Sequence, residues 1–316
     1  MKFRTEIDLK KEFLLDPDNS ILTLGSCFAD RVGQRFVDKG LDTLVNPFGV
    51  IYNPISLHDI LLCSLRGEGV LGEWEEQLSQ FVNTMYHGDF SAESKEEGFK
   101  KAIVAHQSTK KYLEKASTLI ITWGTAYVYE EVESGEIVCN CHRFRANRFR
   151  RRLLGVDEIV LEWADLLQKC FAENPNLKVV LTVSPVRHVR DSLVKNTLSK
   201  SVLHMAVHKL MDKFDKLHYF PSFEIMMDDL RDYRFYDENL VQPNDQAVTY
   251  IVSKFSQQSF SPALVNYWNE AEDIQKLLSH KVKAVGEEAE KFIKKRDQKL
   301  NDFLKKYPFS KLAKNA

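Results

Sequence analysis

Short, uninterrupted runs of apolar residues alternate along the chain with longer stretches in which apolar residues recur every three or four positions. The short runs predict buried strands, and the longer stretches predict amphipathic helices that cover them. The predicted strands are residues 20–24, 43–45, 118–122, 178–183 and 217–220, and the predicted helices are residues 29–39, 56–65, 97–116, 156–171, 199–214 and 245–255. Strands without polar alternation, separated by helices, are typical of a parallel sheet buried on both faces. We therefore expect an α/β fold of three layers.

Two segments depart from this alternation. Residues 127–141 alternate apolar and polar side chains around Ser134-Gly135, which predicts a β-hairpin inserted after the third strand. From Glu270 onward the chain is rich in Lys and Glu, with apolar residues at helical spacing. We expect a charged helical extension over residues 261–316 beside a domain of residues 1–260. The extension is interpreted either as a solvated appendage or as a helix that binds a partner or forms a homodimer with a second copy.

Composition and charge narrow the class of protein. The 316 residues include 44 Lys and Arg against 45 Asp and Glu, a net charge of −1, and 44% are hydrophobic. This balance is ordinary for a globular protein and argues against a surface built to hold nucleic acid or an anionic membrane. The five cysteines do not suggest a disulfide framework, and no apolar run reaches the length of a membrane span. We expect a cytoplasmic protein with no nucleic-acid partner and no membrane partner.

The first predicted strand leads through Gly25 into Ser26 and then into a helix. Ser26 is therefore expected at the carboxyl end of a parallel strand, which is the edge of an α/β sheet where ligands bind. Backbone N–H groups at a helix N-terminus attract the negative charge that develops on an acyl oxygen. Serine is also a preferred helix N-cap. Position alone thus leaves two roles open, nucleophile and cap.

A series of short motifs resembles the GSCFA family, a branch of the SGNH/GDSL hydrolase-like superfamily. In chain order the motifs are Lys2-Phe3-Arg4-Thr5-Glu6, Leu24-Gly25-Ser26-Cys27-Phe28-Ala29, Val45-Asn46-Pro47-Phe48-Gly49, Tyr52-Asn53-Pro54, Trp123-Gly124-Thr125-Ala126, Cys141-His142, Thr182-Val183-Ser184-Pro185-Val186-Arg187-His188, Leu198-Ser199-Lys200 and Arg231-Asp232-Tyr233-Arg234-Phe235-Tyr236. The resemblance implies a flavodoxin-like sheet of the SGNH type whose serine attacks an ester or related acyl carbon. It also implies a small acylated substrate and no cofactor.

The same resemblance implies roles for individual residues. Ser26 matches the nucleophile, and its backbone N–H is one donor to the oxyanion. Gly49 resembles the glycine that supplies a second donor. The superfamily's third block carries glycine and then asparagine, whereas this chain has Gly124 and Thr125, so the Thr125 hydroxyl is the candidate substitute. The residues expected to bind substrate are Asn46, His142 and Arg187.

The superfamily pattern ends in Asp-x-x-His, and here both positions are changed. Asn239 stands at the aspartate position and Gln242 at the histidine position. Amides do not titrate near neutral pH, so neither residue can act as a general base. Two groups could replace the missing general base. One is Asp237 or Glu238, brought to the serine by a shift of loop register, and the other is His188, which follows the fourth predicted strand. His188 is equally a candidate for binding substrate or for pinning its loop.

Three further features of the sequence could carry chemistry: a group of cysteines and a histidine, a single cysteine, and an arginine-rich segment. Cys139, Cys141 and His142 are close in sequence, but no second ligand cluster stands at zinc spacing, so we expect no metal site. Cys27 is interpreted as a packing residue. Residues 143–152 hold six arginines, which indicate a phosphate or RNA contact, a site for an anionic substrate group, or an ion-paired face.

Two hypotheses of function follow. The first is a serine esterase or acyltransferase with Ser26 as nucleophile and a rearranged base. The second is a catalytically silent family member that binds a small acylated or anionic ligand in the same cleft. The amides at 239 and 242 favour the second hypothesis, and the intact serine motif favours the first.

Overall fold

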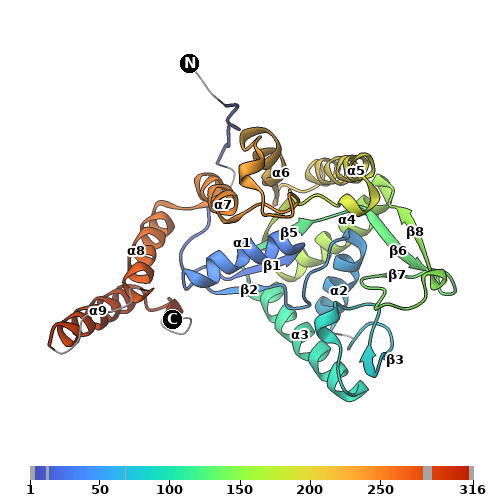
Figure 1. Cartoon of the computed structure of the whole chain (residues 1–316), viewed down its shortest axis with the longest axis horizontal. Helices are drawn as coiled ribbons and strands as arrows, with labels where there is room; N and C mark the ends of the chain where they lie inside the picture. The colour runs from blue at the N-terminus through green and yellow to red at the C-terminus, as the bar shows by residue number, and fades with distance from the viewer. Residues whose placement is uncertain (1–3, 12–13, 68, 280–286, 313–316) are drawn as a thin grey trace.

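A parallel sheet of five strands lies at the centre of the computed structural model, which describes residues 4–11, 14–67, 69–279 and 287–312 (Figure 1). The strands are β1 (Ile21–Gly25), β2 (Thr43–Val45), β5 (Thr118–Trp123), β9 (Lys178–Val183) and β10 (Leu217–Tyr219). Their order is β10-β9-β5-β1-β2, and every pairing is parallel. This is the flavodoxin-like order, so the predicted fold class is confirmed. The family-like residues Lys2 and Phe3 lie outside the described part.

Helices cover both faces of this sheet because its strands present apolar side chains to both sides. The helices are α1 (Cys27–Asp38), α2 (Pro54–Arg66), α3 (Lys95–Lys115), α4 (Val156–Glu173), α5 (Leu193–Met211), α6 (Ser222–Glu224), α7 (Asp245–Ser259), α8 (Pro262–Ser279) and α9 (Glu287–Lys306). Leu22 and Leu24 of β1 point into one core with α2 to α5, whereas Ile21 points into the other with α1, α7 and α8. This alternation is the two-residue period of a strand acting on a fully apolar run.

Two small antiparallel sheets are formed by segments that the chain inserts between successive strands of the central sheet. The predicted hairpin is confirmed as β6 (Tyr127–Glu131) and β7 (Ile137–Val138), and β8 (Phe149–Leu153) joins it in the order β7-β6-β8. The hairpin of β3 (Glu75–Gln77) and β4 (Gln80–Val82) was not expected from the sequence. Strand β8 lacks apolar alternation, and charged pairs of Arg150 and Arg152 with Glu130 of β6 stabilise its pairing.

The end of the arginine-rich segment, residues 149–152, lies in β8, and four arginines of the segment pair with carboxylates on neighbouring elements. Arg150 and Arg152 both pair with Glu130 of β6, and Arg152 also lies 2.6 Å from Glu158. Arg151 pairs with Asp191. Arg148 pairs with Glu75 of β3 and with Glu131 of β6. Of the three interpretations of this segment, an ion-paired face is the one that these four arginines fit.

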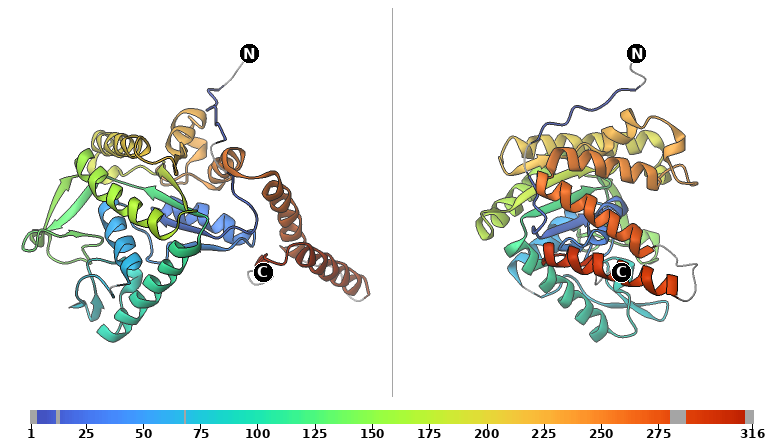
Figure 2. Two further views of the ribbon diagram at one scale, coloured as in Figure 1. Left: turned by 180° about the vertical axis from the view of Figure 1, so that it is seen from behind. Right: turned by 90° about the vertical axis from the view of Figure 1, so that its left-hand side faces the viewer.

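Helices α8 and α9 form an arm at one end of the molecule (Figure 2). The arm is anchored through α8: Leu264 and Tyr267 are fully buried, and the Tyr267 hydroxyl donates to the Lys39 carbonyl at 2.6 Å. Phe303 of α9 packs against the Tyr267 ring with centroids 5.5 Å apart. The extension therefore contacts the body through buried apolar residues of α8, such as Leu264 and Ala271, and through Lys311, whose N–H donates to the Gly40 carbonyl at 2.7 Å. A homodimer through this arm stays a prediction, and residues 280–286 lie outside the described part. None of the described helices is both long enough and apolar enough to span a bilayer.

Asp42, just before β2, joins three distant segments. Its carboxylate accepts hydrogen bonds from Lys311, Ser20 and Tyr112. Burial by itself raises the pKa of this carboxyl, but the hydrogen bonds outweigh burial and lower the pKa to about 2. Because the folded-state pKa lies below the unfolded value, the stabilisation is present above about pH 4 and is lost as the pH falls towards 2.

We expect Asp42→Asn to lower the free energy of unfolding by about 1–2 kcal/mol at pH 7 and to flatten its dependence on pH between about 4 and 2. Urea unfolding at several pH values measures both effects. The exposed Asp18 provides the control, since Asp18→Asn removes the same charge without those three partners. Equal effects of the two substitutions would contradict the prediction.

Candidate functional site

The loops that follow the strands of the central sheet meet at its carboxyl edge. Gly25 of β1 pairs with Thr122 of β5, and Thr122 pairs with Thr182 of β9. The segments beginning at Ser26, Gly124 and Ser184 therefore leave neighbouring strands at the same level. Most of the predicted site residues lie in these loops and in the loop after β2, whereas His142 follows β7, and Asn239 and Gln242 precede α7.

Ser26 is the N-cap of α1 and is fully buried, with 0% of its surface exposed. Its Oγ accepts a hydrogen bond from the Phe28 N–H at 3.3 Å, and its own N–H donates to the Thr122 carbonyl at 3.1 Å. Gly25 makes this junction possible because its φ of +135° turns the strand sharply into the helix. The N–H of Ser26 is thus occupied by the neighbouring strand in this structure.

The other predicted oxyanion donors also have partners within the protein. The Gly49 N–H donates to the Asn46 carbonyl at 2.8 Å, and the Gly124 N–H donates to the Tyr52 carbonyl at 2.7 Å. The Thr125 hydroxyl lies 3.0 Å from Ser199 Oγ. These groups would have to exchange partners before they could bind an oxyanion. Their role in an oxyanion hole stays a prediction.

His188 follows β9, and its side chain is partly buried. Burial, assisted by the positive charges of Lys200 and Arg151, lowers the pKa of His188 to about 4. Its ring meets the edge of the Tyr52 ring, with centroids 5.5 Å apart. Nε2 is buried and has no hydrogen-bond partner among the described residues. A neutral imidazole with a free buried nitrogen can accept a proton.

Lys200 ends the Leu198-Ser199-Lys200 motif, but the sequence by itself assigns this lysine no role. It lies on α5 with only 2% of its surface exposed, and Nζ donates to the carbonyls of Gly124 at 2.7 Å and Ser184 at 2.6 Å. Burial lowers the pKa of Lys200 to about 7. A signal was present in the sequence, because helical spacing from Leu203 and Val207 places Lys200 on the apolar face of its helix.

The two amides of the altered Asp-x-x-His block lie in a loop that precedes α7. Asn239 Oδ1 accepts the N–H groups of Val241 at 2.8 Å and Gln242 at 3.0 Å, so this side chain shapes its own turn. The Asp237 carboxylate pairs with Arg31 of α1 at 3.1 Å, and Glu238 is exposed. Asp237 therefore fastens the loop to α1, which argues against the shift of register.

The three predicted substrate-binding residues each hold a loop in place. Asn46 Oδ1 accepts the Gly25 N–H at 2.9 Å, and His142 Nε2 lies 2.8 Å from the Asn83 carbonyl. The Arg187 guanidinium lies over the Tyr236 ring, 5.6 Å from its centroid. A contact with substrate stays a prediction for all three residues.

One protein-family model matches the part of the chain that forms the sheet and the loops at its carboxyl edge. The model of the GSCFA family matches residues 20–255, which begin at β1 and end within α7. The chain belongs to the GSCFA family. A comparison with curated proteins finds no match. The family match includes the sheet and the loops at its carboxyl edge, and it leaves the α8–α9 arm outside.

Two cysteines of this GSCFA protein pack against the apolar cores: Cys27 against one and Cys139 against the other. Burial raises the pKa of the Cys27 thiol, and it raises the pKa of Cys139 to about 12. Across the described ranges, His, Cys, Asp and Glu side chains nowhere gather in a group of three or more that could hold a metal ion.

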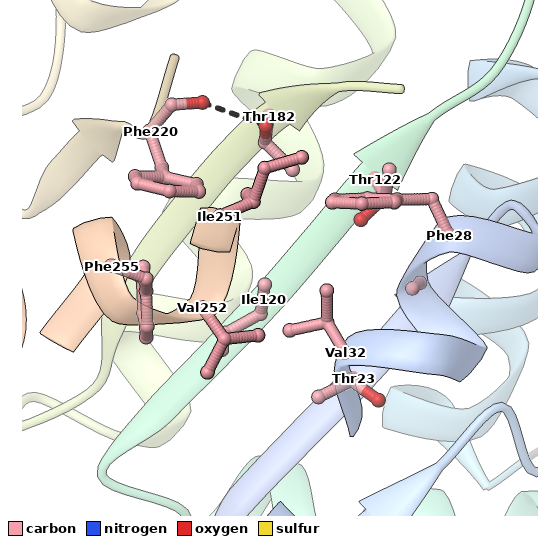
Figure 3. A pocket seen from close by; sticks show the side chains of 11 residues that line it. Thr23, Phe28, Val32, Ile120, Thr122, Thr182, Phe220, Ile251, Val252 and Phe255 are labelled. Carbon is pink, nitrogen blue, oxygen red and sulfur yellow. Dashed lines mark hydrogen bonds between the residues drawn. The ribbon is translucent and has the colours of Figure 1, made fainter. Parts of the chain in front are cut away.

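A small apolar cavity lies between the sheet and helices α1 and α7 (Figure 3). Phe28 of α1, Ile120 of β5 and Phe255 of α7 are among its lining residues, and its volume is about 20 Å³. A space of this size holds about one water molecule. The cavity is therefore too small for an acyl chain, although Phe28 and Thr122 connect its wall to the Ser26 junction.

Proposed function

We propose that this GSCFA protein is an acyl hydrolase or acyltransferase of the SGNH type that acts on a small acylated molecule. Ser26 is the nucleophile and His188 is the general base. The observation that carries the proposal is the free, buried Nε2 of a neutral His188 at the sheet edge where Ser26 caps α1. The base that Gln242 cannot provide is thus supplied from the loop after β9.

The chemistry follows the usual serine route. The Phe28 N–H bond uses a lone pair of Ser26 Oγ and leaves the hydroxyl proton to be donated. His188 Nε2 takes this proton as Oγ bonds to the acyl carbon, and it returns the proton to the leaving oxygen when the ester bond breaks. Water or an acceptor alcohol then releases the acyl group from Ser26. The positive end of α1 favours the oxyanion.

A serine-directed fluorophosphonate tests this proposal. We expect covalent labelling that maps to Ser26 by mass spectrometry and is absent in Ser26→Ala. Labelling should be slow, because Ser26 is fully buried and neighbouring side chains must move before the reagent reaches it. Cys27→Ala is the matched control at the next position and should label like the wild type. Equal labelling of wild type and Ser26→Ala would contradict the proposal.

A second candidate is a silent protein that binds a small acylated or anionic ligand in the same place. It is favoured by the internal partners of the Gly49 and Gly124 N–H groups, which hold them in turns. In that case ligands would raise the melting temperature of wild type and Ser26→Ala alike, and a broad ester panel would show no turnover by either protein.

A further inference from the structure

Lys200 is a buried amine to which the proposed mechanism assigns no step. It belongs to α5, and no carboxylate among the described residues pairs with it. A lysine almost never lies so deep without a charged partner. Its Nζ has two acceptors, the main-chain carbonyls of Gly124 and Ser184.

These two carbonyls belong to different loops at the carboxyl edge. Gly124 is the first residue after β5, and Ser184 is the first residue after β9. The β9 loop continues through residues 185–187 to His188, whose N–H donates to Asn196 of α5 at 2.9 Å. One amine therefore joins the loop that carries the proposed base to the loop that carries Gly124 and Thr125.

We propose that Lys200 is a positioning residue of the Ser26 site: by bonding both carbonyls from within α5, its Nζ fixes the loop that carries His188 against the loop after β5. The proposal rests on the proposed function in that His188 is the base. Lys200 acts through His188 and does not contact the reacting atoms.

The positive charge of Lys200 also lowers the pKa of His188, as does the charge of Arg151 of β8. The Tyr52 ring, in the loop before α2, packs against the same imidazole. The charge also acts on the Cys27 thiol of α1 and on His204 of α5. Removing a positive charge near an imidazole makes its protonation easier, so loss of Lys200 should raise the pKa of His188.

The test compares Lys200→Met with Lys195→Met, a control on an exposed position of the same helix. In Lys200→Met we expect the amides of residues 124–126 and 184–188 to exchange hydrogen at least about 10-fold faster, while amides of β1 and β5 keep their protection. Nuclear magnetic resonance should show a His188 pKa about half a pH unit or more above that of the wild type. Lys195→Met should change neither property.

Wild-type exchange rates at residues 124–126 and 184–188 in Lys200→Met would overturn the inference, whatever the pKa of His188. Faster exchange throughout the sheet would also overturn it, because Lys200 would then support the whole fold and not the two loops. If Lys200→Met does not fold, Lys200→Gln decides the question: its amide keeps two donors without the charge, so residues 124–126 and 184–188 should keep exchange close to that of the wild type, and faster exchange throughout the sheet would count against the proposal.

Labelling of Ser26 by fluorophosphonate distinguishes failure of this inference from failure of the proposed function. If fluorophosphonate labels Ser26, Lys200→Met should label at least about 10-fold more slowly. In a plot of labelling rate against pH, the fall on the acid side should move to higher pH. If wild-type Ser26 is not labelled, the proposed function fails, and the exchange and His188 measurements still decide whether Lys200 fixes the two loops.

Discussion

Gly25→Ala is expected to unfold the protein, or to lower its free energy of unfolding by more than about 4 kcal/mol. A Cβ at this position would lie 2.2 Å from the Thr122 carbonyl oxygen, which belongs to the neighbouring strand. The backbone cannot turn away, because Gly25 is also paired with Thr122 in the sheet and donates its N–H to Asn46. A φ of +135° adds strain for any residue with a side chain.

Urea unfolding followed by circular dichroism measures this effect, and Gly135→Ala is its control. Gly135 also has a positive φ, +74°, but a Cβ there would have no neighbour within 4 Å. We expect Gly135→Ala to cost about 1 kcal/mol, which is the conformational term alone. A similar small loss in Gly25→Ala would show that β1 and β5 can separate, contrary to the prediction.

His188→Ala is expected to lower kcat/KM for a reactive ester by about 10³-fold or more, the cost of losing a general base. The matched control is His208→Ala, an exposed histidine on α5. If Ser26→Ala abolishes hydrolysis and His188→Ala does not, a different group takes the serine proton.

The pH profile gives an independent check on His188. Only the neutral imidazole can accept the proton, and burial lowers the pKa of His188 to about 4. The rate should therefore stay constant from neutral pH down to about pH 5 and fall only near pH 4. An exposed histidine would lose activity near pH 6.5 instead. An acid limb near that higher value would contradict the assignment of His188 as the base.

The sequence by itself determined the central sheet. Runs such as residues 119–121 and 179–181 are apolar without alternation, and a short run of this kind between helical stretches is typical of a strand with both faces buried, so class and strand positions could be predicted. The junction of β1 and α1 was also predictable, because apolar run, glycine, serine and helical pattern follow one another directly. The motifs at 24–29 and beyond placed the chain in its family. The strand β8 was missed because it is rich in arginine, and the charges of Arg150 and Arg152 are balanced by Glu130 on the partner strand β6.

Only the tertiary structure decided which polar groups at the site are free. The Gly124 N–H and carbonyl are bonded to Tyr52 and Lys200, and the Lys200 contact spans 76 residues of chain. Nothing near Gly124 in the sequence indicates these partners. Whether Ser26 is exposed or buried likewise depends on how separate loops pack over it. A local pattern of residues determines whether a segment forms a helix or a strand, because that choice depends on neighbouring residues. Hydrogen-bond partners and burial depend on segments that meet only after folding.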